Sequence, residues 1–396
     1  MSPQYGGPVA AMHVMAQGLS AQGATVDVAT IREQIDHTAV ANESWEDRVS
    51  FRLIQFPLSL KPYRISLGLQ RWLERNVLNY DLVHVHAVFT HASMAAARAA
   101  RKANIPYIIR PLGILNQWGL QARRPWLKKI FLRWIDGPLL RSANVIHLTS
   151  KQELEEVRHL GLGTPLVELP LGIDLSGFSD LPDPSKFFGK HPEARGDPVV
   201  MFLSRLHPKK GLDLLLPAFE QVRRHHPEAK LVIVGDGSPD FVTQLHQQAK
   251  DLGIQNSIAW AGFLGENERL EALAACDIFC LPSHSENFGV ALLEAMAAAR
   301  ACISSDQVAL GATAAKTGAI VKCTCDVSSV ASAILDLAKA GPARRKDLGD
   351  RALKYARDHH GVDDVGNRLH ELYRRILQGS RSTGSNHDSK EETQTS

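Results

Sequence analysis

Residues 277–300 constrain the fold of this chain more than any other stretch. They begin with an apolar run over residues 277–281, which predicts a buried strand, and after a short loop they continue as a helix rich in Ala, Leu and Met. Glu294 is the only charged residue between Phe288 and Ala299. A helix that is apolar on all sides is buried, so the Glu294 carboxylate needs a partner that offsets its loss of water.

Two kinds of partner would satisfy Glu294. One is an arginine or lysine within the core, and the other is a set of hydroxyl groups on a bound ligand. Glu286 lies in the loop before the helix, beside the backbone N–H groups of residues 287–290. Such groups at a helix start bind anions and hydroxyl oxygens, so a ligand site is one of the two possibilities that the residues leave open.

Length and composition indicate two globular domains. The chain has 396 residues, of which 44% are hydrophobic, and its formal net charge of +3 is too small to indicate a nucleic-acid binder. No apolar run reaches the roughly 18 residues of a membrane span, and the N-terminus has no basic-then-apolar signal, so we expect a cytoplasmic protein. The five cysteines form no Cys-x2-Cys unit, and we expect buried, reduced thiols: Cys276, Cys280, Cys302, Cys323 and Cys325.

Strand and helix patterns alternate with short joins along the chain, which predicts α/β domains with parallel sheets covered on both faces. The first domain is expected to have strands at residues 25–30, 50–56, 81–88, 106–110, 145–149 and 167–171, and helices at 9–21, 65–78, 91–103 and 151–160. The second is expected to have strands at 199–205, 230–234, 257–263, 277–281, 302–305 and 319–323, and helices at 212–224, 266–275, 327–340, 342–359 and 365–377.

Residues 176–197 are rich in proline and have no clear periodicity, which predicts a linker. We therefore expect an N-terminal domain over residues 1–180 and a C-terminal domain over 181–360. Residues 361–378 should form a helix that packs back on the N-terminal domain. Residues 379–396 are polar and are expected to be disordered.

The first eight residues predict a glycine loop that leads into the first helix. In a doubly wound domain, such a loop normally follows a central strand, and too few apolar residues precede this one to form that strand. We therefore expect the strands at 25–30 and 83–88 to flank a gap or to have closed over it. An added apolar strand at the start of the chain should then make the protein more stable and more active.

Two cations follow the strand at residues 199–205. Arg205 and Lys210 lie five residues apart, and Gly211 stands at the turn. A planar guanidinium and an ammonium at a strand end suit a diphosphate, although a solvated basic turn is the alternative. The later Gly235-Asp236-Gly237 sequence is by itself a weak phosphate-loop signal.

His84 and His86 share one face of their strand because side chains alternate along a strand. They form either a satisfied pair within the core, or a pair whose His86 lines the strand end where parallel sheets bind ligands.

Residues 123–134 interleave basic and large apolar side chains. This pattern suits a helix at a membrane surface. The alternative is an ordinary surface helix whose Trp126, Ile130 and Trp134 face the core at fourfold spacing.

Several motifs together resemble the retaining glycosyltransferases of family 4. They are the Glu286-x7-Glu294 pattern around Phe288-Gly289-Val290, the Arg205 to Lys210-Gly211 turn, and Gly6-Gly7-Pro8. The resemblance covers roughly residues 5–377. It implies the GT-B fold, in which two Rossmann-like doubly wound domains face a cleft.

The resemblance also implies roles for particular residues. Glu294 would hold the nucleotide ribose, Glu286 the donor sugar, and Arg205 and Lys210 the diphosphate. Catalytic roles are expected for Glu286, Arg205, Lys210 and His86. Donor-binding roles are expected for Gly7, Gly235, Phe263, Leu264, Asn287, Phe288, Gly289, Val290 and Glu294.

The chain departs from the family pattern at two points that bear on the chemistry. The family has a strand before its Gly-Gly-Pro loop, so this sequence looks truncated at the start. Leu112 stands where many members have a histidine near the donor sugar. The chain has no Asp-x-Asp, and we expect neither a metal nor a cofactor.

We therefore expect a retaining glycosyltransferase, acting in polysaccharide or glycolipid biosynthesis. Its donor would be a UDP-, GDP- or ADP-sugar, and its acceptor a sugar or a lipid-linked sugar. Contact with the inner face of a membrane would come through residues 123–134. The alternatives are a nucleotide-sugar epimerase or sugar phosphorylase of the same fold, and a non-catalytic protein that still binds nucleotide.

Overall fold

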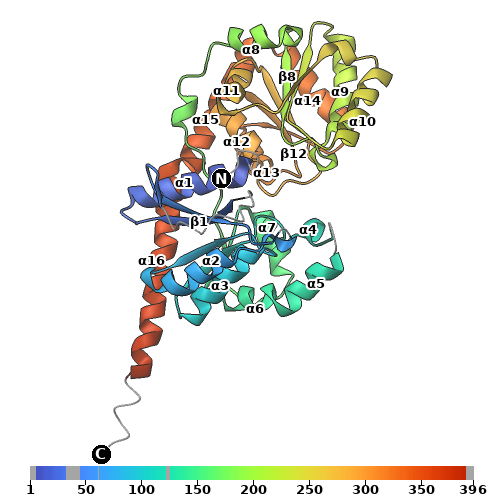
Figure 1. The fold of residues 1–396 in the computed structure, drawn as a ribbon. Helices are drawn as coiled ribbons and strands as arrows, with labels where there is room; N and C mark the ends of the chain where they lie inside the picture. Colours follow the sequence, from blue (N-terminus) through green and yellow to red (C-terminus); the bar gives the residue numbers. More distant parts are fainter. Residues whose placement is uncertain (1–5, 33–44, 61, 122–124, 389–396) are drawn as a thin grey trace, which may run out of the picture. The chain divides into compact units, whose positions relative to one another are not determined.

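The computed structural model describes residues 6–32, 45–60, 62–121 and 125–388. The chain divides into two compact units (Figure 1). The N-terminal unit comprises Met1–Gly172 together with Val362–Ser396, and the C-terminal unit comprises Ile173–Gly361. The division therefore falls a few residues before the expected boundary at residue 180.

The strands of the N-terminal unit form two separate sheets. In one, β3 (Arg52–Pro57) lies between β1 (Asp27–Arg32), to which it is parallel, and the short antiparallel β2 (Glu46–Asp47). The other is wholly parallel, in the order β4 (Val83–His86), β5 (Tyr107–Arg110), β6 (Val145–Leu148) and β7 (Leu166–Glu168). The two strands that were expected to flank a gap, β1 and β4, thus lie in different sheets.

Helices cover both sheets of this unit (Figure 1). They are α1 (Gly6–Ala21), α2 (Leu67–Asn76), α3 (His91–Lys102), α4 (Gln117–Gln121), α5 (Pro125–Trp134), α6 (Asp136–Ser142), α7 (Lys151–Arg158) and α16 (Val362–Asp388). Hydroxyl groups of Ser66 and Ser150 begin α2 and α7 by accepting backbone N–H groups of the first turn. The expectation that Gly7 lies in a loop is wrong, because α1 begins at Gly6 and Pro8 is compatible with a first helical turn.

Aromatic packing joins the two sheets across the break between β1 and β4. The ring of Trp72 on α2 lies 5.7 Å from that of Phe56 on β3 and 6.3 Å from that of Tyr80, just before β4. The Tyr80 hydroxyl donates to Asp27 Oδ2 at 2.8 Å, and Arg52 also donates to this carboxylate. One core therefore serves both sheets.

Helices α1 and α16 pack against each other on the N-terminal unit (Figure 1). Their backbones approach most closely at Gly18 and Gly366, where a Cβ on Gly366 would lie 2.5 Å from the carbonyl oxygen of Gly18. The expected helix end at residue 378 is wrong, because α16 runs on to Asp388. A helix that is already nucleated extends at little cost, even through polar residues. Residues 389–396 of the expected tail lie outside the described part of the chain.

The C-terminal unit has one parallel sheet of six strands, whose central strands are buried along their whole length. The order is β10 (Ile258–Gly262), β9 (Lys230–Val234), β8 (Val199–Leu203), β11 (Ile278–Leu281), β12 (Ala301–Ser305) and β13 (Val321–Cys323). Its helices are α8 (Ser185–Lys190), α9 (Leu212–His225), α10 (Pro239–Asp251), α11 (Glu266–Ala274), α12 (Val290–Ala297), α13 (Ala309–Ala314), α14 (Val327–Lys339) and α15 (Gly341–His360).

The expected linker at residues 176–197 is part of this unit and contains α8. The prolines obscured its periodicity, but Phe187 and Ala194 are fully buried, and Lys190 forms an ion pair with Glu271 on α11 at 2.9 Å. Buried side chains of this kind hold the segment on the unit.

Replacing Gly366 by alanine tests the packing of α1 on α16. The added methyl group has no room against the Gly18 backbone, so Gly366→Ala should lower the free energy of unfolding by about 1–3 kcal/mol. Gly379→Ala on the same helix is the matched control, because its Cβ would meet nothing within 4 Å. Equal chemical denaturation midpoints for the two variants would contradict the close contact.

Candidate functional site

The C-terminal sheet reverses its strand order between β8 and β11. From β8 the chain adds β9 and β10 on one side, and then β11, β12 and β13 on the other. In open parallel sheets, ligands bind at the carboxyl ends of the strands beside such a reversal. The site therefore belongs where the loops after β8 and β11 meet.

Backbone contacts hold these loops together. The N–H of His284, after β11, donates to the Lys209 carbonyl at 2.9 Å. On the other side, the N–H of Leu206, after β8, donates to the Asp236 carbonyl at 2.7 Å, in the loop after β9. Gly211 has φ 77°, and a Cβ there would lie 2.0 Å from the Pro282 carbonyl oxygen. Only glycine fits this turn.

Lys210 and Glu286 meet across these loops. The distance from Lys210 Nζ to Glu286 Oε2 is 2.5 Å, and the two side chains are 12% and 21% exposed. Sequence reasoning assigned them to a diphosphate and a sugar, and the structure brings them into direct contact. Arg205 lies on the same loop as Lys210 with an exposed side chain, and no carboxylate of the described residues pairs with it.

The loop that carries Glu286 is fixed from the neighbouring segment after β12. The Glu286 N–H donates to the Gln307 carbonyl at 3.0 Å, and the Phe288 carbonyl accepts from the Leu310 N–H at 3.1 Å. The Phe288 ring is buried, edge-on to His360 at 5.5 Å. The loop then enters α12 through Gly289, so the N–H groups at the start of α12, at and after Val290, stand next to Asn287 and Glu286.

Glu294 on α12 has the cation partner that sequence analysis left open. Arg269 on α11 places a guanidinium nitrogen 3.5 Å from Glu294 Oε1. The Glu294 side chain is 13% exposed, and burial raises its pKa above the ordinary value, while Arg269 acts in the opposite direction. Sequence reasoning missed Arg269, because the sequence of α11 is typical of a charged surface helix.

The remaining predicted donor residues of this unit follow β9 and β10. Gly235 comes directly after β9, and its N–H donates to the Gly262 carbonyl at 2.8 Å. Phe263, directly after β10, is 57% exposed, whereas Leu264 is buried. These residues thus lie at the same sheet edge as the loops of Lys210 and Glu286, and their roles stay predictions.

Gly7 and His86 belong to the N-terminal unit, so their expected donor-binding and catalytic roles stay predictions. The His86 ring stacks on that of His84 with centroids 4.7 Å apart, and its Nδ1 lies 3.5 Å from an Arg110 nitrogen. Burial, reinforced by Arg110, holds the pKa of His86 well below its usual range. His84 is partly buried and has a hydrogen-bond partner, because its Nδ1 lies 2.7 Å from the Tyr373 hydroxyl.

Sequence reasoning also missed a buried polar group in the N-terminal unit. Arg110 is 1% exposed, and burial lowers its pKa to about 10. Nearby, Glu153 is buried and accepts the N–H groups of Gly113 and Thr149, both at 2.8 Å. The Ser150-x-x-Glu153 spacing, a helix-start signature, was the available signal for Glu153.

The described residues lack two features that would bear on function. No cluster of His, Cys, Asp and Glu side chains there is arranged to hold a metal ion. No helix there is both long and apolar enough to cross a bilayer. All five cysteines are free thiols, and four of them are buried.

Family comparisons cover both units. The sequence profile of "Glycosyl transferases group 1" matches residues 183–355, and that of "Glycosyl transferase 4-like domain" matches residues 6–172. The chain belongs to the family 4 glycosyltransferases. The glycosyltransferase motifs quoted from the sequence lie within these matches.

Characterised relatives are similar over part of their length. Mannosylfructose-phosphate synthase of Agrobacterium fabrum is 28% identical over 57% of this chain and 54% of its own. The GDP-mannose-dependent alpha-(1-6)-phosphatidylinositol monomannoside mannosyltransferase of Mycolicibacterium smegmatis is 31% identical over 54% of this chain and 57% of its own. The chain thus spans about half the length of these relatives.

A solved structure shows the fold. The HepE protein of Anabaena, in complex with UDP and glucose, is 19% identical and superposes with a TM-score of 0.73, covering 94% of this chain and 97% of its own. The chain therefore has the GT-B fold, with a Rossmann-like domain in each unit.

The titration of Glu294 should be visible in the stability of the protein. Because its folded pKa is raised, the unfolded chain ionises first, and stability falls as pH rises above about 4.5, the ordinary value. Glu294→Gln cannot ionise, so its free energy of unfolding relative to wild type should increase from pH 4.5 towards neutrality. Denaturant unfolding at several pH values measures this. If the free energies of unfolding of the two proteins changed with pH in parallel, the raised pKa of Glu294 would be contradicted.

Proposed function

We propose that this protein is a retaining glycosyltransferase that moves a sugar from a nucleotide-sugar donor to an acceptor hydroxyl. The family supports sugar transfer, and the contact between Lys210 and Glu286 is the observation that carries the assignment to this site. A cation for phosphate and a carboxylate for sugar hydroxyls lie side by side at the sheet reversal, as a sugar diphosphate requires.

Each charge at the site has a distinct task in this proposal. Arg205 and Lys210 neutralise the diphosphate, first in the bound donor and then more strongly as it leaves. Glu286 gives up part of its contact with Lys210 and accepts hydroxyl groups of the sugar. Glu294, which Arg269 helps to keep ionised, accepts the ribose hydroxyls from the first turns of α12.

The reaction would then need no protein base. The bond between the anomeric carbon and the diphosphate oxygen breaks, and the acceptor oxygen bonds to the same face of that carbon. The acceptor proton passes to the departing phosphate oxygen. The protein contributes position and charge, because Lys210, Arg205 and the N–H groups at the start of α12 stabilise the leaving diphosphate.

The donor and acceptor classes are proposed from the names of similar proteins. The Anabaena protein binds UDP, and the mycobacterial relative is GDP-mannose-dependent, so uridine and guanosine diphosphate sugars are the first donors to test, followed by adenosine. The mycobacterial acceptor is a phosphatidylinositol monomannoside, which supports a lipid-linked or other sugar acceptor here.

Removing the two cations should abolish tight nucleotide binding. Arg205→Ala combined with Lys210→Ala should weaken UDP or GDP binding by about 1.5–3 kcal/mol for each lost charged hydrogen bond. Titration calorimetry measures the affinity for UDP or GDP, and thermal unfolding checks that the variant folds. Lys209→Ala, in the same turn, is the matched control for loss of a positive charge and should retain most of the affinity. If both variants lost similar amounts of nucleotide affinity, Arg205 and Lys210 could no longer be assigned to the diphosphate.

Helix α5 presents the surface expected to meet a membrane. Trp126, Ile130 and Trp134 are 62%, 46% and 69% exposed, so the prediction that they face the core is wrong. The helix is anchored instead by neighbouring positions: Phe131 stacks on Tyr63 at 5.6 Å. We propose that α5 docks the enzyme on the inner face of a membrane, near a lipid-linked acceptor. In this proposal the protein is cytoplasmic and peripheral to the membrane.

Docking through α5 is testable with vesicles. Trp126→Ser combined with Trp134→Ser should weaken binding to mixed phosphatidylcholine and phosphatidylglycerol vesicles at least about tenfold, because two aromatic anchors are lost. Leu78→Ser is the matched control, since Leu78 is 70% exposed in the same unit. Co-sedimentation measures both variants. Undiminished binding of the tryptophan variant would exclude α5 as the docking surface.

A second candidate is a nucleotide-binding protein without transfer activity. The break between β1 and β4, and Leu112 in place of a polar residue, favour this reading. Binding of a nucleoside diphosphate without consumption of any donor sugar, in the presence of an acceptor panel, would support it. Phosphate-dependent cleavage of a disaccharide would instead identify a phosphorylase.

A further inference from the structure

One long stretch of the N-terminal unit gathers positive charge at its surface. Between Asp81 and Glu153 the sequence has eleven Arg and Lys residues and a single acidic residue, Asp136, although the net charge of the whole chain is only +3. Asp136 is buried, and its Oδ1 accepts the Phe89 N–H at 3.1 Å. The exposed residues that the structure describes in this stretch therefore include no carboxylate.

A pocket of about 300 Å³ opens in this stretch, where α6 packs against both α3 and α5 (Figure 1). Arg98, Arg101 and Lys102 line it from the last two turns of α3, and Trp134 lines it from the end of α5. The volume is at the lower end of the range for small-ligand sites. Three cations and one indole thus surround a hollow that suits a single small anionic group.

The three cations lie on one face of α3, because residues three and four positions apart are neighbours on a helix. Arg98, Arg101 and Lys102 are all exposed, and within the ranges that the structure describes none of them forms an ion pair with a carboxylate. Like charges at this spacing repel one another. An anion bound among them would remove this unfavourable interaction.

The end of α3 explains only part of this cluster. Arg101 and Lys102 stand in the last turn, where positive charge complements the helix dipole. That turn already has backbone partners, since the Asn104 N–H donates to the Arg101 carbonyl at 3.3 Å. Arg98 lies one turn earlier, and the effect of the dipole is confined to the last turn. The helix end therefore does not account for Arg98.

Exposed apolar side chains lie next to the cations and indicate the kind of anion. Trp134 belongs to the pocket wall, and Ile130 is exposed one turn earlier on α5. The Arg133 guanidinium lies 5.1 Å from the centroid of the Trp134 ring. A nucleic acid would cover the cations but leave Ile130 in water. A bilayer covers both, because its phosphates lie at the level of the cations and its acyl chains lie below them.

We propose that this pocket binds the phosphate headgroup of an anionic phospholipid. The inference rests on the docking of α5 proposed above, and it names the lipid that α5 meets. Arg98, Arg101 and Lys102 donate to the phosphate oxygens, and Trp134 lies beside the glycerol at the interface. Docking is then selective for a negatively charged membrane.

Removing charge from the pocket should weaken binding only where the vesicle carries anionic lipid. Arg98→Gln combined with Lys102→Gln should weaken binding to mixed phosphatidylcholine and phosphatidylglycerol vesicles about tenfold or more, because each basic residue contributes to attraction at such a surface. On vesicles of phosphatidylcholine alone, this variant should bind like the wild type. Co-sedimentation measures both, and thermal unfolding checks that the variant folds.

Arg71→Gln combined with Arg75→Gln on α2 is the matched control. These two residues are exposed cations of the same unit with the same fourfold spacing, and neither lines the pocket. The control should stay within about threefold of the wild type on mixed vesicles, because it changes only the net charge. If both glutamine variants lost the same affinity, net charge alone would explain binding and the pocket would carry no lipid.

The tryptophan variant described above separates this inference from the docking of α5. Trp126→Ser combined with Trp134→Ser should also weaken binding to pure phosphatidylcholine, which the Arg98 and Lys102 variant leaves unchanged. If only the glutamine variant lost binding to mixed vesicles, the docking of α5 would be wrong and the headgroup pocket would be supported. If the glutamine variant bound mixed vesicles like the wild type, the pocket proposal would be wrong whatever the tryptophans do.

Competition identifies the source of the phosphate. Inorganic phosphate, at the same concentration as the lipid phosphate, should not release the wild-type protein from mixed vesicles, because a free ion offers no apolar contact to Trp134. Release would assign the pocket to free phosphate. A single-stranded RNA oligonucleotide should bind more weakly than the vesicles. Equally tight RNA binding that is lost in the Arg98 and Lys102 variant but kept in the α2 control would overturn the lipid assignment.

Discussion

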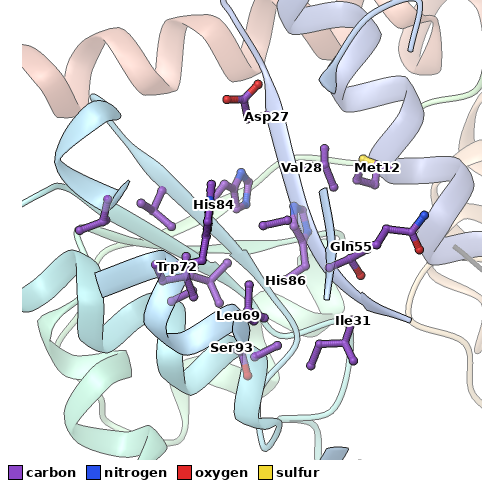
Figure 2. A pocket seen from close by; sticks show the side chains of 18 of the residues that line it. Met12, Asp27, Val28, Ile31, Gln55, Leu69, Trp72, His84, His86 and Ser93 are labelled. Atoms are coloured by element: carbon purple, nitrogen blue, oxygen red, sulfur yellow. The ribbon is translucent and has the colours of Figure 1, made fainter. Parts of the chain in front are cut away.

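Hydrogen bonding between neighbouring strands determines which loops meet in each unit of the molecule. In the C-terminal unit, β8 has β9 on one side and β11 on the other, so their carboxyl-end loops are forced together and Lys210 meets Glu286. In the N-terminal unit, β1 and β4 each have one neighbour, and Trp72 with the Tyr80–Asp27 hydrogen bond holds the sheets together instead. The first arrangement makes a charged site, and the second leaves a pocket lined by residues of β1 and β4 (Figure 2).

The elements were predictable where apolar runs are continuous or helices are amphipathic. Residues 199–203 and 278–281 are buried along their whole length, so their strands could be recognised without knowledge of their neighbours. The segment around Phe187 could not, because its burial depends on a surface far away in sequence. The extension of α16 to Asp388 could not either, since its polar residues carry no periodic signal.

The candidate site was predictable in its residues but not in its pairings. Glu286, Glu294 and Lys210 stood out because charges at strand ends and in an apolar helix need a reason. Arg269 did not, because a charged residue on an amphipathic helix is ordinary. Its contact with Glu294 arises only when α11 and α12 pack side by side. The structure therefore confirms a cation partner for Glu294, because Arg269 lowers the cost of burying its carboxylate, and the ligand reading stays a prediction.

Periodicity shows that a helix or strand has an apolar side, but not what covers that side. Trp126 and Trp134 have the fourfold spacing of a core-facing stripe and are exposed, because Phe131 and Leu132 supply the contacts of α5 with the rest of the unit. Likewise, the alternation of strands and helices does not show which neighbours a strand has, and β1 and β4 each have one edge that no described strand pairs with. A bilayer core offers no hydrogen-bonding partners, so it suits the apolar side chains of α5 but not the unpaired edges of β1 and β4.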